Sequence, residues 1–408
     1  MSDAAATPLI GRRGLLRGVA FAAAAAPILT EAHLARAAQT QATPHGMALH
    51  GQAPDLPPPD AVLINANENP LGPSKAACEA IAQIAPLGGR YDIRGETALL
   101  ARTFADQHKL PVDHVAVYAG SSEPLHYTVL AFTSPSRSFV TGDPSYEAGR
   151  VAAAATGAKV HFVPLTADCA HDMRAMVKAD PNAGVIYVCN PNNPTGTITP
   201  KADIVWALEN KPAGSILLVD EAYIHLSDAQ DMLDLVAAGK ELVVLRTFSK
   251  IYGMAGIRCG FAVGRPDLLA KLKPYGENPM PVTASAAALA SLLDASLIPT
   301  RKRLIAETRT ATLQWLRAGG YKVIGESQSN CFMVDTDVDG KAVIAAMRAR
   351  KVYIGRTWPV WPNAVRISVG TPEEMAAFRL AWKAVMDDRT ALAAIDPAPG
   401  RERFVHLS

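Results

Sequence analysis

The chain has 408 residues, of which 49% are hydrophobic and 19% charged, and this composition excludes disorder for most of its length. Forty Lys and Arg against 38 Asp and Glu leave a net charge of +2, which gives no electrostatic reason to expect nucleic acid or acidic lipid as a partner. The five cysteines are scattered without a C-x-x-C pair, so we expect neither a disulfide framework nor a metal site.

Residues 1–37 have the order of an export signal. The pair Arg12-Arg13 precedes an apolar segment at residues 19–29, and residues 35–37 (Ala-Arg-Ala) fit a cleavage site, so the segment resembles a twin-arginine signal. An Ala-rich amphipathic helix is the alternative. Cleavage would leave 36 residues of each sign and no net charge. We therefore predict a periplasmic protein that is exported folded and has no other association with a membrane.

Residues 38–60 contain three consecutive prolines and are expected to form an extended arm. Beyond it, seven short and mostly apolar runs alternate with Ala- and Leu-rich stretches, as in parallel strands that helices cover on both faces. We predict an α/β fold with a mostly parallel seven-stranded sheet, in a large domain at residues 91–288. The strands are expected at Val115–Tyr118, Ser138–Thr141, Lys159–Val163, Val185–Cys189, Ile216–Val219, Leu242–Arg246 and Gly260–Val263.

The pattern changes after Ala288, where strands become fewer and helices longer. We predict a smaller α+β domain built from residues 61–90 and 289–408. Its helices are expected at Pro299–Gly319 and Pro372–Met386, and its strands near Tyr321–Ile324, Phe332–Val334, Val352–Ile354 and Val365–Ser368.

Ligands of open parallel sheets bind at the carboxyl ends of the strands, where loops and helix N-termini meet. Gly120, Ser121 and Ser122 follow the first predicted strand and lead into a helix. Gly permits a tight turn, Ser supplies a cap, and the free N–H groups favour an anion such as phosphate. Tyr146 follows the second strand, where its ring can lie flat against a planar ligand. Each feature alone has a structural explanation, as an ordinary helix cap or a half-buried tyrosine.

Two further strand ends carry polar side chains. Asn193, in the loop at residues 190–196, can offer an amide group to a ring oxygen. Asp220 ends a buried apolar strand, where a carboxylate is costly without a cationic partner such as a protonated pyridine nitrogen. Tyr223 lies three residues later and can hydrogen-bond a neighbouring ring oxygen.

Lys250 follows the sixth predicted strand, where burial and nearby positive charge would allow its amine to form a Schiff base. Taken alone, it could be a surface lysine. Thr247, Ser249 and Arg258 offer hydroxyl and guanidinium groups suited to a phosphate. An amine, an anion for a ring nitrogen, donors for a ring oxygen and a phosphate site are together what pyridoxal 5'-phosphate requires. The strand ends therefore predict this cofactor.

From about Leu63 to Met386 the chain closely resembles the fold-type I pyridoxal-phosphate aminotransferases of class I/II, and among them the histidinol-phosphate aminotransferase-like branch. The motifs that carry the resemblance are Asn65–Ser74, Asn190–Gly196, Asp220–Tyr223, and Arg246–Lys250 with Arg258 eight residues beyond.

The resemblance implies a role for each residue at the cofactor. Lys250 would hold the cofactor and carry the substrate proton, and Asp220 would pair with the ring nitrogen. Asn193 and Tyr223 would bond the ring oxygen, and Tyr146 would stack on the ring. The phosphate would be held by Gly120, Ser121, Ser122, Thr247, Ser249 and Arg258.

The resemblance also implies a homodimer and a substrate site. Tyr91 matches a tyrosine that reaches the phosphate of the neighbouring subunit, although Tyr91-Asp92-Ile93 departs from the common Tyr-Pro-Asp. Arg366 matches the arginine that binds the substrate α-carboxylate. Arg356 matches a second arginine near the substrate side chain, and Asn67 and Asn193 would also contact the substrate. Metal ligands are not expected.

We therefore predict an aminotransferase that moves an amino group between an L-amino acid and a 2-oxo acid by a ping-pong mechanism through a Schiff base at Lys250. An amino-acid oxidase or decarboxylase on the same scaffold is the first alternative, and a non-catalytic binding protein the second. The donor and acceptor are not identified by the motifs. Trp358 and Trp361 suggest an aromatic or cationic substrate side chain, but packing is the more frequent explanation for two tryptophans near a strand.

Overall fold

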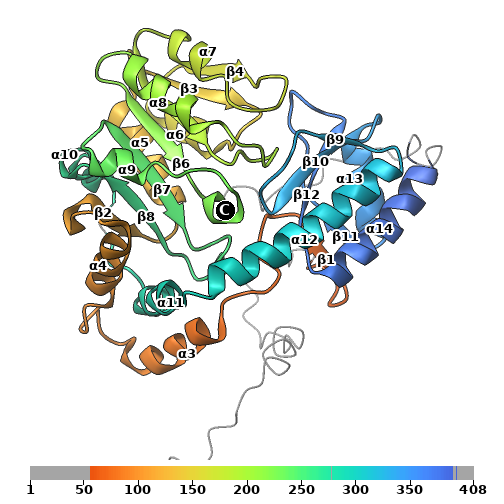
Figure 1. The fold of residues 1–408 in the computed structure, drawn as a ribbon, viewed down its shortest axis with the longest axis horizontal. Coiled ribbons are helices and arrows are strands. Elements are labelled where there is room, and N and C mark those ends of the chain that lie inside the picture. The colour runs from red at the N-terminus through yellow and green to blue at the C-terminus, as the bar shows by residue number, and fades with distance from the viewer. Residues whose placement is uncertain (1–55, 277, 389–391, 393–408) are drawn as a thin grey trace, which may run out of the picture. The chain divides into compact units, whose positions relative to one another are not determined.

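The computed structural model describes residues 56–276, 278–388 and 392 (Figure 1). The predicted export signal, most of the predicted arm and the end of the chain lie outside these residues. All three sheets belong to one unit that begins at Asp60.

The largest sheet has seven strands in the order β2-β8-β7-β6-β5-β3-β4. Only β8 runs antiparallel to its neighbours, so the predicted α/β fold with a mostly parallel sheet is confirmed. β5, β6 and β7 are buried along their whole length, which explains their continuous apolar sequences. The strands are β2 (Val115–Tyr118), β3 (Ser138–Asp143), β4 (Val160–Pro164), β5 (Ala183–Cys189), β6 (Ile216–Asp220), β7 (Leu242–Thr247) and β8 (Gly260–Gly264).

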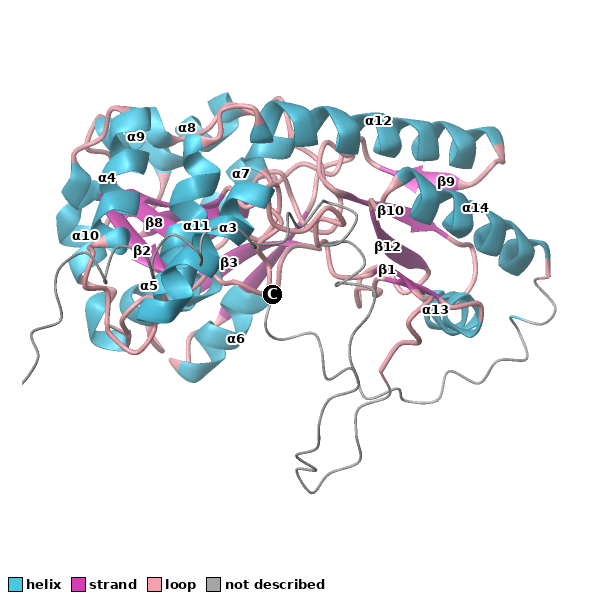
Figure 2. Ribbon diagram, turned by 90° about the horizontal axis from the view of Figure 1, so that it is seen from below, coloured by secondary structure: helices cyan, strands magenta, loops and turns pink. Residues whose placement is uncertain are grey.

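Helices cover both faces of this sheet. Figure 2 shows α8 (Lys201–Asn210) and α9 (Leu233–Ala237) on one face, and α5 (Ser122–Phe132) and α6 (Ala148–Ala155) on the other. Two further helices of this part are α7 (Met173–Lys178) and α10 (Pro266–Ala270). This arrangement leaves the carboxyl ends of the central strands free to carry loops.

Two smaller sheets are built mainly from strands that follow the long helix α12 (Leu297–Ala318) in the sequence. One is antiparallel, in the order β12-β10-β9, and the other is the parallel pair β1 and β11. A single hydrophobic cluster joins the large sheet to these elements. Their bounds are β1 (Val62–Ile64), β9 (Lys322–Ile324), β10 (Cys331–Asp335), β11 (Val352–Ile354), β12 (Ala364–Ser368), α13 (Gly340–Ala349) and α14 (Pro372–Asp387).

The segment at residues 61–90, predicted to belong to the small domain, contacts both parts of the molecule. Its strand β1 pairs with β11, whereas its helix α3 (Lys75–Ile84) packs against α11 (Val282–Leu293). The same helix α11 packs against α4 (Glu96–His108), whose first N–H groups donate to the carboxylate of Asp92. The domain boundaries stay a prediction.

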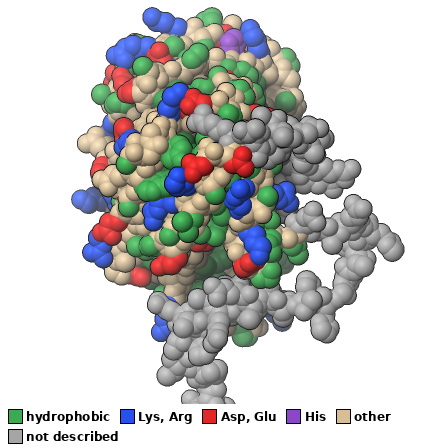
Figure 3. Space-filling model, turned by 90° about the vertical axis from the view of Figure 1, so that its right-hand side faces the viewer, with side chains coloured by type: hydrophobic (Ala, Val, Ile, Leu, Met, Phe, Trp, Pro, Cys, Tyr) green, Lys and Arg blue, Asp and Glu red, His purple; other side chains and the backbone are tan. Residues whose placement is uncertain are grey.

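The surface shows charges of both signs. On the face in Figure 3, basic and acidic side chains are interspersed, in keeping with the near-zero net charge. Among the described residues, no single helix is long and apolar enough to cross a membrane. The same residues contain no group of three His, Cys, Asp or Glu side chains that could hold a metal ion.

Candidate active site

The strand order brings the predicted site residues together, because β7, β6, β5 and β3 are consecutive in the sheet and parallel. The loops that follow them carry Lys250, Asn193 and Tyr146, and Asp220 is the last residue of β6. These four side chains come from a segment of about a hundred residues. The parallel order of the strands therefore brings them together at the carboxyl edge of the large sheet.

Asp220 is a buried carboxylate held by two donors. The hydroxyl of Tyr187 donates to Oδ2 at 3.0 Å, and the N–H of Ala222 donates to Oδ1 at 3.1 Å. Burial raises the pKa of Asp220 to about 6, although both hydrogen bonds and the positive charge of Lys250 oppose this rise. No ion pair involves Asp220 among the described residues, so a cationic ring nitrogen would supply the missing partner.

Lys250 is a buried amine with an altered acidity. Only 8% of the residue is exposed, and its Nζ lies 5.5 Å from the centre of the Tyr223 ring. Burial lowers the pKa of Lys250 to about 8, and the charge of Arg366 acts in the same direction. A lysine with such a pKa has a substantial neutral fraction near physiological pH, which is the form that attacks a carbonyl.

Tyr223 is oriented by Asn67. The Nδ2 of Asn67 donates to the Tyr223 hydroxyl at 3.1 Å, and Ser368 donates to Oδ1 of the same amide at 3.0 Å. Asn67 has a positive φ of 54°, a backbone conformation that asparagine tolerates better than most residues. This network fixes the tyrosine hydroxyl at the edge of the site.

Arg366 lies on β12 and reaches toward the loops of the large sheet. It donates to Oδ1 of Asn193 at 2.9 Å and to the carbonyl of Asn65 at 2.7 Å. Its Nε is buried and has no hydrogen-bond partner among the described residues. An unsatisfied buried guanidinium nitrogen indicates a missing acceptor, and a carboxylate provides oxygens in the matching geometry.

The predicted phosphate residues converge at the start of α5. Arg258 donates to Oγ of Ser249 at 3.3 Å, and Thr247 donates to the same oxygen at 3.0 Å. Gly120 has a φ of +92°, and a Cβ there would lie 2.3 Å from the guanidinium of Arg258. A side chain at position 120 would therefore displace the Arg258 guanidinium, and the positive φ favours glycine there as well.

One expectation for this loop is wrong. Ser121 is the residue before the first turn of α5, but its side chain makes no capping hydrogen bond. Its φ of −86° and ψ of −11° are helical, whereas a capping serine has extended geometry. The first turn is therefore left with N–H groups available to an anion.

Tyr146 and Ser122 meet across the two loops. A hydrogen bond from Ser122 acts on the Tyr146 hydroxyl, while burial raises the pKa of that hydroxyl to about 12. The ring thus lies beside the phosphate residues and stays neutral at physiological pH.

Arg356 lies at the margin of this site. It forms an ion pair with Glu147, and its guanidinium carbon is 4.3 Å from the centre of the Trp358 ring. Trp358 is 1% exposed and donates to the carbonyl of Ser145 at 3.2 Å.

Tyr91 is the one predicted site residue that the structure leaves outside this cluster. Its side chain lies before α4 and is 83% exposed, so it is not part of the buried site within a single chain. Its predicted role at a neighbouring subunit's phosphate stays a prediction.

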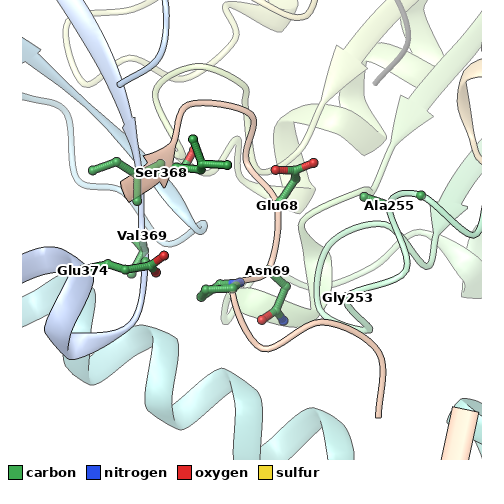
Figure 4. Close-up of a pocket in the computed structure, with 12 residues that line it drawn as sticks. Glu68, Asn69, Gly253, Ala255, Ser368, Val369 and Glu374 are labelled. Carbon is green, nitrogen blue, oxygen red and sulfur yellow. The ribbon is translucent and has the colours of Figure 1, made fainter. Parts of the chain in front are cut away.

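A pocket of about 300 Å³ lies beside the site, where the segment of Glu68 and Asn69 passes between the end of β12 and the loop of Gly253 and Ala255 (Figure 4). The negative charge of Glu68 acts on Lys250 and favours its protonated form. The described residues that line this pocket include none of those predicted to hold the cofactor.

Sequence reasoning missed two residues of the site, Tyr187 and Glu147. Tyr187 lies inside the apolar strand β5. A hydroxyl buried in such a strand needs a hydrogen-bond partner, and this need could have indicated its contact with Asp220. Glu147 follows Tyr146 directly, but its pairing with a residue 209 positions away leaves no local pattern.

The residues present fit pyridoxal 5'-phosphate on three observations. Asp220 is a buried carboxylate that no cation of the described residues pairs with, and Lys250 is a buried amine of lowered pKa. The cradle between Gly120 and Arg258 would be filled by a Cβ at position 120. Each of these features is costly by itself and is compensated by a bound anion with a cationic ring.

Comparisons with known proteins agree with this geometry. The family model described as aminotransferase class I and II matches residues 47–379. An aromatic amino acid aminotransferase of Rhodococcus jostii (strain RHA1) is 36% identical over 324 residues, which are 78% of this chain and 89% of that protein. A histidinol-phosphate aminotransferase of Symbiobacterium thermophilum is 34% identical over 336 residues, which are 81% of this chain and 91% of that protein.

A solved structure gives the same result. The histidinol-phosphate aminotransferase of Sinorhizobium meliloti in complex with pyridoxal 5'-phosphate superposes with a TM-score of 0.74 at 25% identity, and the match covers 80% of this chain and 91% of that one. The cofactor predicted from the strand ends is thereby supported. The chain belongs to the class I and II aminotransferases and is a pyridoxal-phosphate-dependent enzyme that moves an amino group between an amino acid and a 2-oxo acid.

Proposed function

We propose that Lys250 is the residue that bonds covalently to the cofactor and moves the substrate α-proton. The observation that carries this proposal is the placement of a buried, low-pKa amine at the strand end next to Asp220. When bound, pyridoxal phosphate supplies an electron sink for the substrate α-carbon. Asp220 would hold the ring nitrogen in its protonated form, and its two hydrogen bonds fix the position of the carboxylate.

Arg366 binds the substrate α-carboxylate in this proposal. That role is supported by its Nε, which has no hydrogen-bond partner among the described residues, and by its contact with Asn193, the amide that would bond the cofactor ring oxygen. Asn67 acts through Tyr223, whose hydroxyl it orients and whose ring centre lies 5.5 Å from the amine of Lys250. Substrate and cofactor therefore share Asn193 as a common contact.

Two substrate classes are suggested by the relatives, since one is named for aromatic amino acids and another for histidinol phosphate. An L-amino acid would give up its amino group and leave as a 2-oxo acid, and a second 2-oxo acid would then take up that group. The amino group is conserved over the two halves, so the purified enzyme should form product in equal amounts without releasing ammonia, peroxide or carbon dioxide.

Replacement of Lys250 tests the proposal. We expect Lys250→Ala to lower kcat for amino transfer by a factor of about 10³ or more, because it removes both the covalent attachment and the proton carrier. Lys240→Ala, at an exposed lysine in the turn after α9, is the matched control and should keep full activity. Retention of wild-type turnover by the Lys250 variant would refute the assignment. Turnover is measured as 2-oxo acid formed from a panel of donors.

We propose that the protein works as a homodimer in which Tyr91 reaches the phosphate of the neighbouring subunit. The support is an aromatic side chain that is 83% exposed, next to Ile93, which is 72% exposed. Two such residues on one segment are more readily explained by a partner surface than by exposure to water.

We also propose that the chain is exported folded by a twin-arginine route and works in the periplasm. The support is the order of charged, apolar and small residues within residues 1–37. Mass spectrometry of the protein from the periplasmic fraction should place the mature N-terminus near Ala38. Arg12→Lys with Arg13→Lys should retain the protein in the cytoplasm, and unchanged export of that variant would contradict the proposal.

A further inference from the structure

Trp358 lies against two arginines. The guanidinium carbon of Arg356 is 4.3 Å from the ring centre, and that of Arg366 is 5.5 Å away. The two arginines are also close in the backbone, because the N–H of Arg366 donates to the carbonyl of Arg356. The positive charge of Arg356 lowers the pKa of Arg366 in addition to the larger effect of burial. A second cation thus lies next to the one suited to an α-carboxylate.

Glu147 holds this second cation. Its carboxylate pairs with Arg356 through Oε2 and with Arg150 at 2.7 Å through Oε1. The side chains of Glu147 and Arg356 are 15% and 19% exposed, so solvent screens their pairing less than it would on an open surface. Glu147 precedes α6 but makes no capping bond there, which leaves both of its oxygens to the arginines.

The charged side chains of the pocket beside Trp358 are balanced by Arg356, whereas Arg366, which also faces the Trp358 ring, has no carboxylate partner among the described residues. A pocket of about 170 Å³ is lined by Asp143, Glu147 and Arg150 together with Tyr146, Phe162, Trp358 and Pro359. Its two carboxylates are matched by Arg150 and by the adjacent Arg356. The pocket therefore has aromatic walls and no surplus positive charge that would attract an anionic group.

We propose that Glu147 is a specificity-determining residue, which neutralises Arg356 so that the site disfavours anionic substrate side chains and accepts uncharged aromatic ones next to Trp358. This inference rests on the proposed function and assigns a substrate class to the same site. Arg366 remains the guanidinium for the α-carboxylate, because Glu147 does not pair with it. Removing the negative charge would free Arg356 for a second anion.

The test compares kcat/KM for L-glutamate and L-phenylalanine in the cofactor-loaded enzyme. We expect Glu147→Gln to raise the ratio of kcat/KM for glutamate to kcat/KM for phenylalanine by about tenfold, mainly by lowering KM for glutamate. The increase should be smaller at high salt, because salt screens the attraction between the two charges. The double variant Glu147→Gln with Arg356→Gln should lose this gain. Glu326→Gln, which removes an exposed ion pair with Arg317, is the matched control and should leave the ratio unchanged.

The outcomes separate the two proposals. If the wild-type enzyme and Glu326→Gln transfer amino groups but Glu147→Gln leaves the ratio within about twofold, the role of Glu147 is refuted while the aminotransferase function stands. The same conclusion follows if both donors lose turnover equally, because that is the effect of a merely structural residue. If the wild-type enzyme transfers no amino group from any donor, the proposed function itself fails.

Discussion

Asp220 and Lys250 have pKa values displaced in opposite directions by the same cause. Burial favours the neutral form of each, so the pKa of Asp220 rises to about 6 and that of Lys250 falls to about 8. Groups with displaced pKa values are concentrated at active sites, because they are costly unless a ligand compensates them. Without cofactor, both residues should therefore reduce the stability of the fold near neutral pH.

Asp220→Asn tests this cost. The folded-state pKa of Asp220 is above its unfolded value, so its contribution to stability is present below about pH 4 and is lost as pH rises through about 6. We expect the cofactor-free variant to be more stable than the cofactor-free wild type at pH 7, by about 1–3 kcal/mol, and equally stable at pH 4. Urea unfolding at both pH values measures this. A less stable variant at pH 7 would contradict the account, and cofactor affinity should fall in the same variant.

The local sequence was sufficient to predict those site residues that stand as polar side chains at the end of an apolar strand. Asp220 ends a buried apolar run, and Asn193 and Lys250 lie a few residues beyond the ends of two others, so their convergence could be foreseen. Tyr187 and Glu147 could not, because the first has an apolar context and the second depends on Arg356, which a different part of the chain supplies.

At the scale of elements, the ends of β6 and β7 are joined by a buried ion pair. The Nε of Arg246 lies 2.7 Å from Oε2 of Glu221. Glu221 follows Asp220 directly, and Arg246 precedes Thr247. Burial raises the pKa of Glu221 to about 7, whereas the charge of Arg246 opposes this. The pair aligns the strand that ends at Asp220 with the strand that leads to Lys250.

The turn before α5 gives a prediction at this scale. We expect Gly120→Ala to weaken cofactor binding by about tenfold or more, because its Cβ would meet the guanidinium of Arg258 at 2.3 Å. Gly239→Ala is the matched control, since Gly239 also has a positive φ but has no atom within 4 Å of an added Cβ. Absorbance titration with pyridoxal phosphate measures both affinities. Equal affinities in the two variants would show that the close approach is unimportant.

The seven strands of the large sheet were predicted within a few residues, because most of them are continuous or nearly continuous apolar runs. β1 and α13 were not. β1 has three residues and pairs with β11, some 290 positions later, so neither its length nor its partner produces a local pattern. α13 begins at a glycine, Gly340, which has low helix propensity, so its start has no clear signal in the sequence.

The whole molecule has a near-zero net charge, and its surface charges are interspersed. This distribution favours association through a specific contact surface over long-range attraction by charges of one sign. Tyr91 and Ile93 supply exposed apolar area on such a surface. Arg258 and the hydroxyl groups around it are predicted to bind the phosphate within one chain, and a tyrosine from a second copy would add one donor.

Tyr91→Phe tests this addition. It removes the hydroxyl and keeps the ring, so we expect a dimer with cofactor affinity lowered by about tenfold, as one hydrogen bond to a charged group would give. Sedimentation equilibrium gives the assembly state and a cofactor titration gives the affinity. A wild-type monomer with full cofactor occupancy would contradict the shared site, as would an unchanged affinity in the variant.

The most direct measurement of the central claim is borohydride reduction of the cofactor-loaded enzyme, followed by digestion and mass spectrometry of the peptides. Reduction fixes a carbon–nitrogen bond between an amine and an aldehyde, so the labelled residue reports the attachment point. We predict one labelled peptide carrying the cofactor mass on Lys250. A label on any other lysine, or an unlabelled Lys250 in an enzyme that is fully loaded and active, would contradict the account.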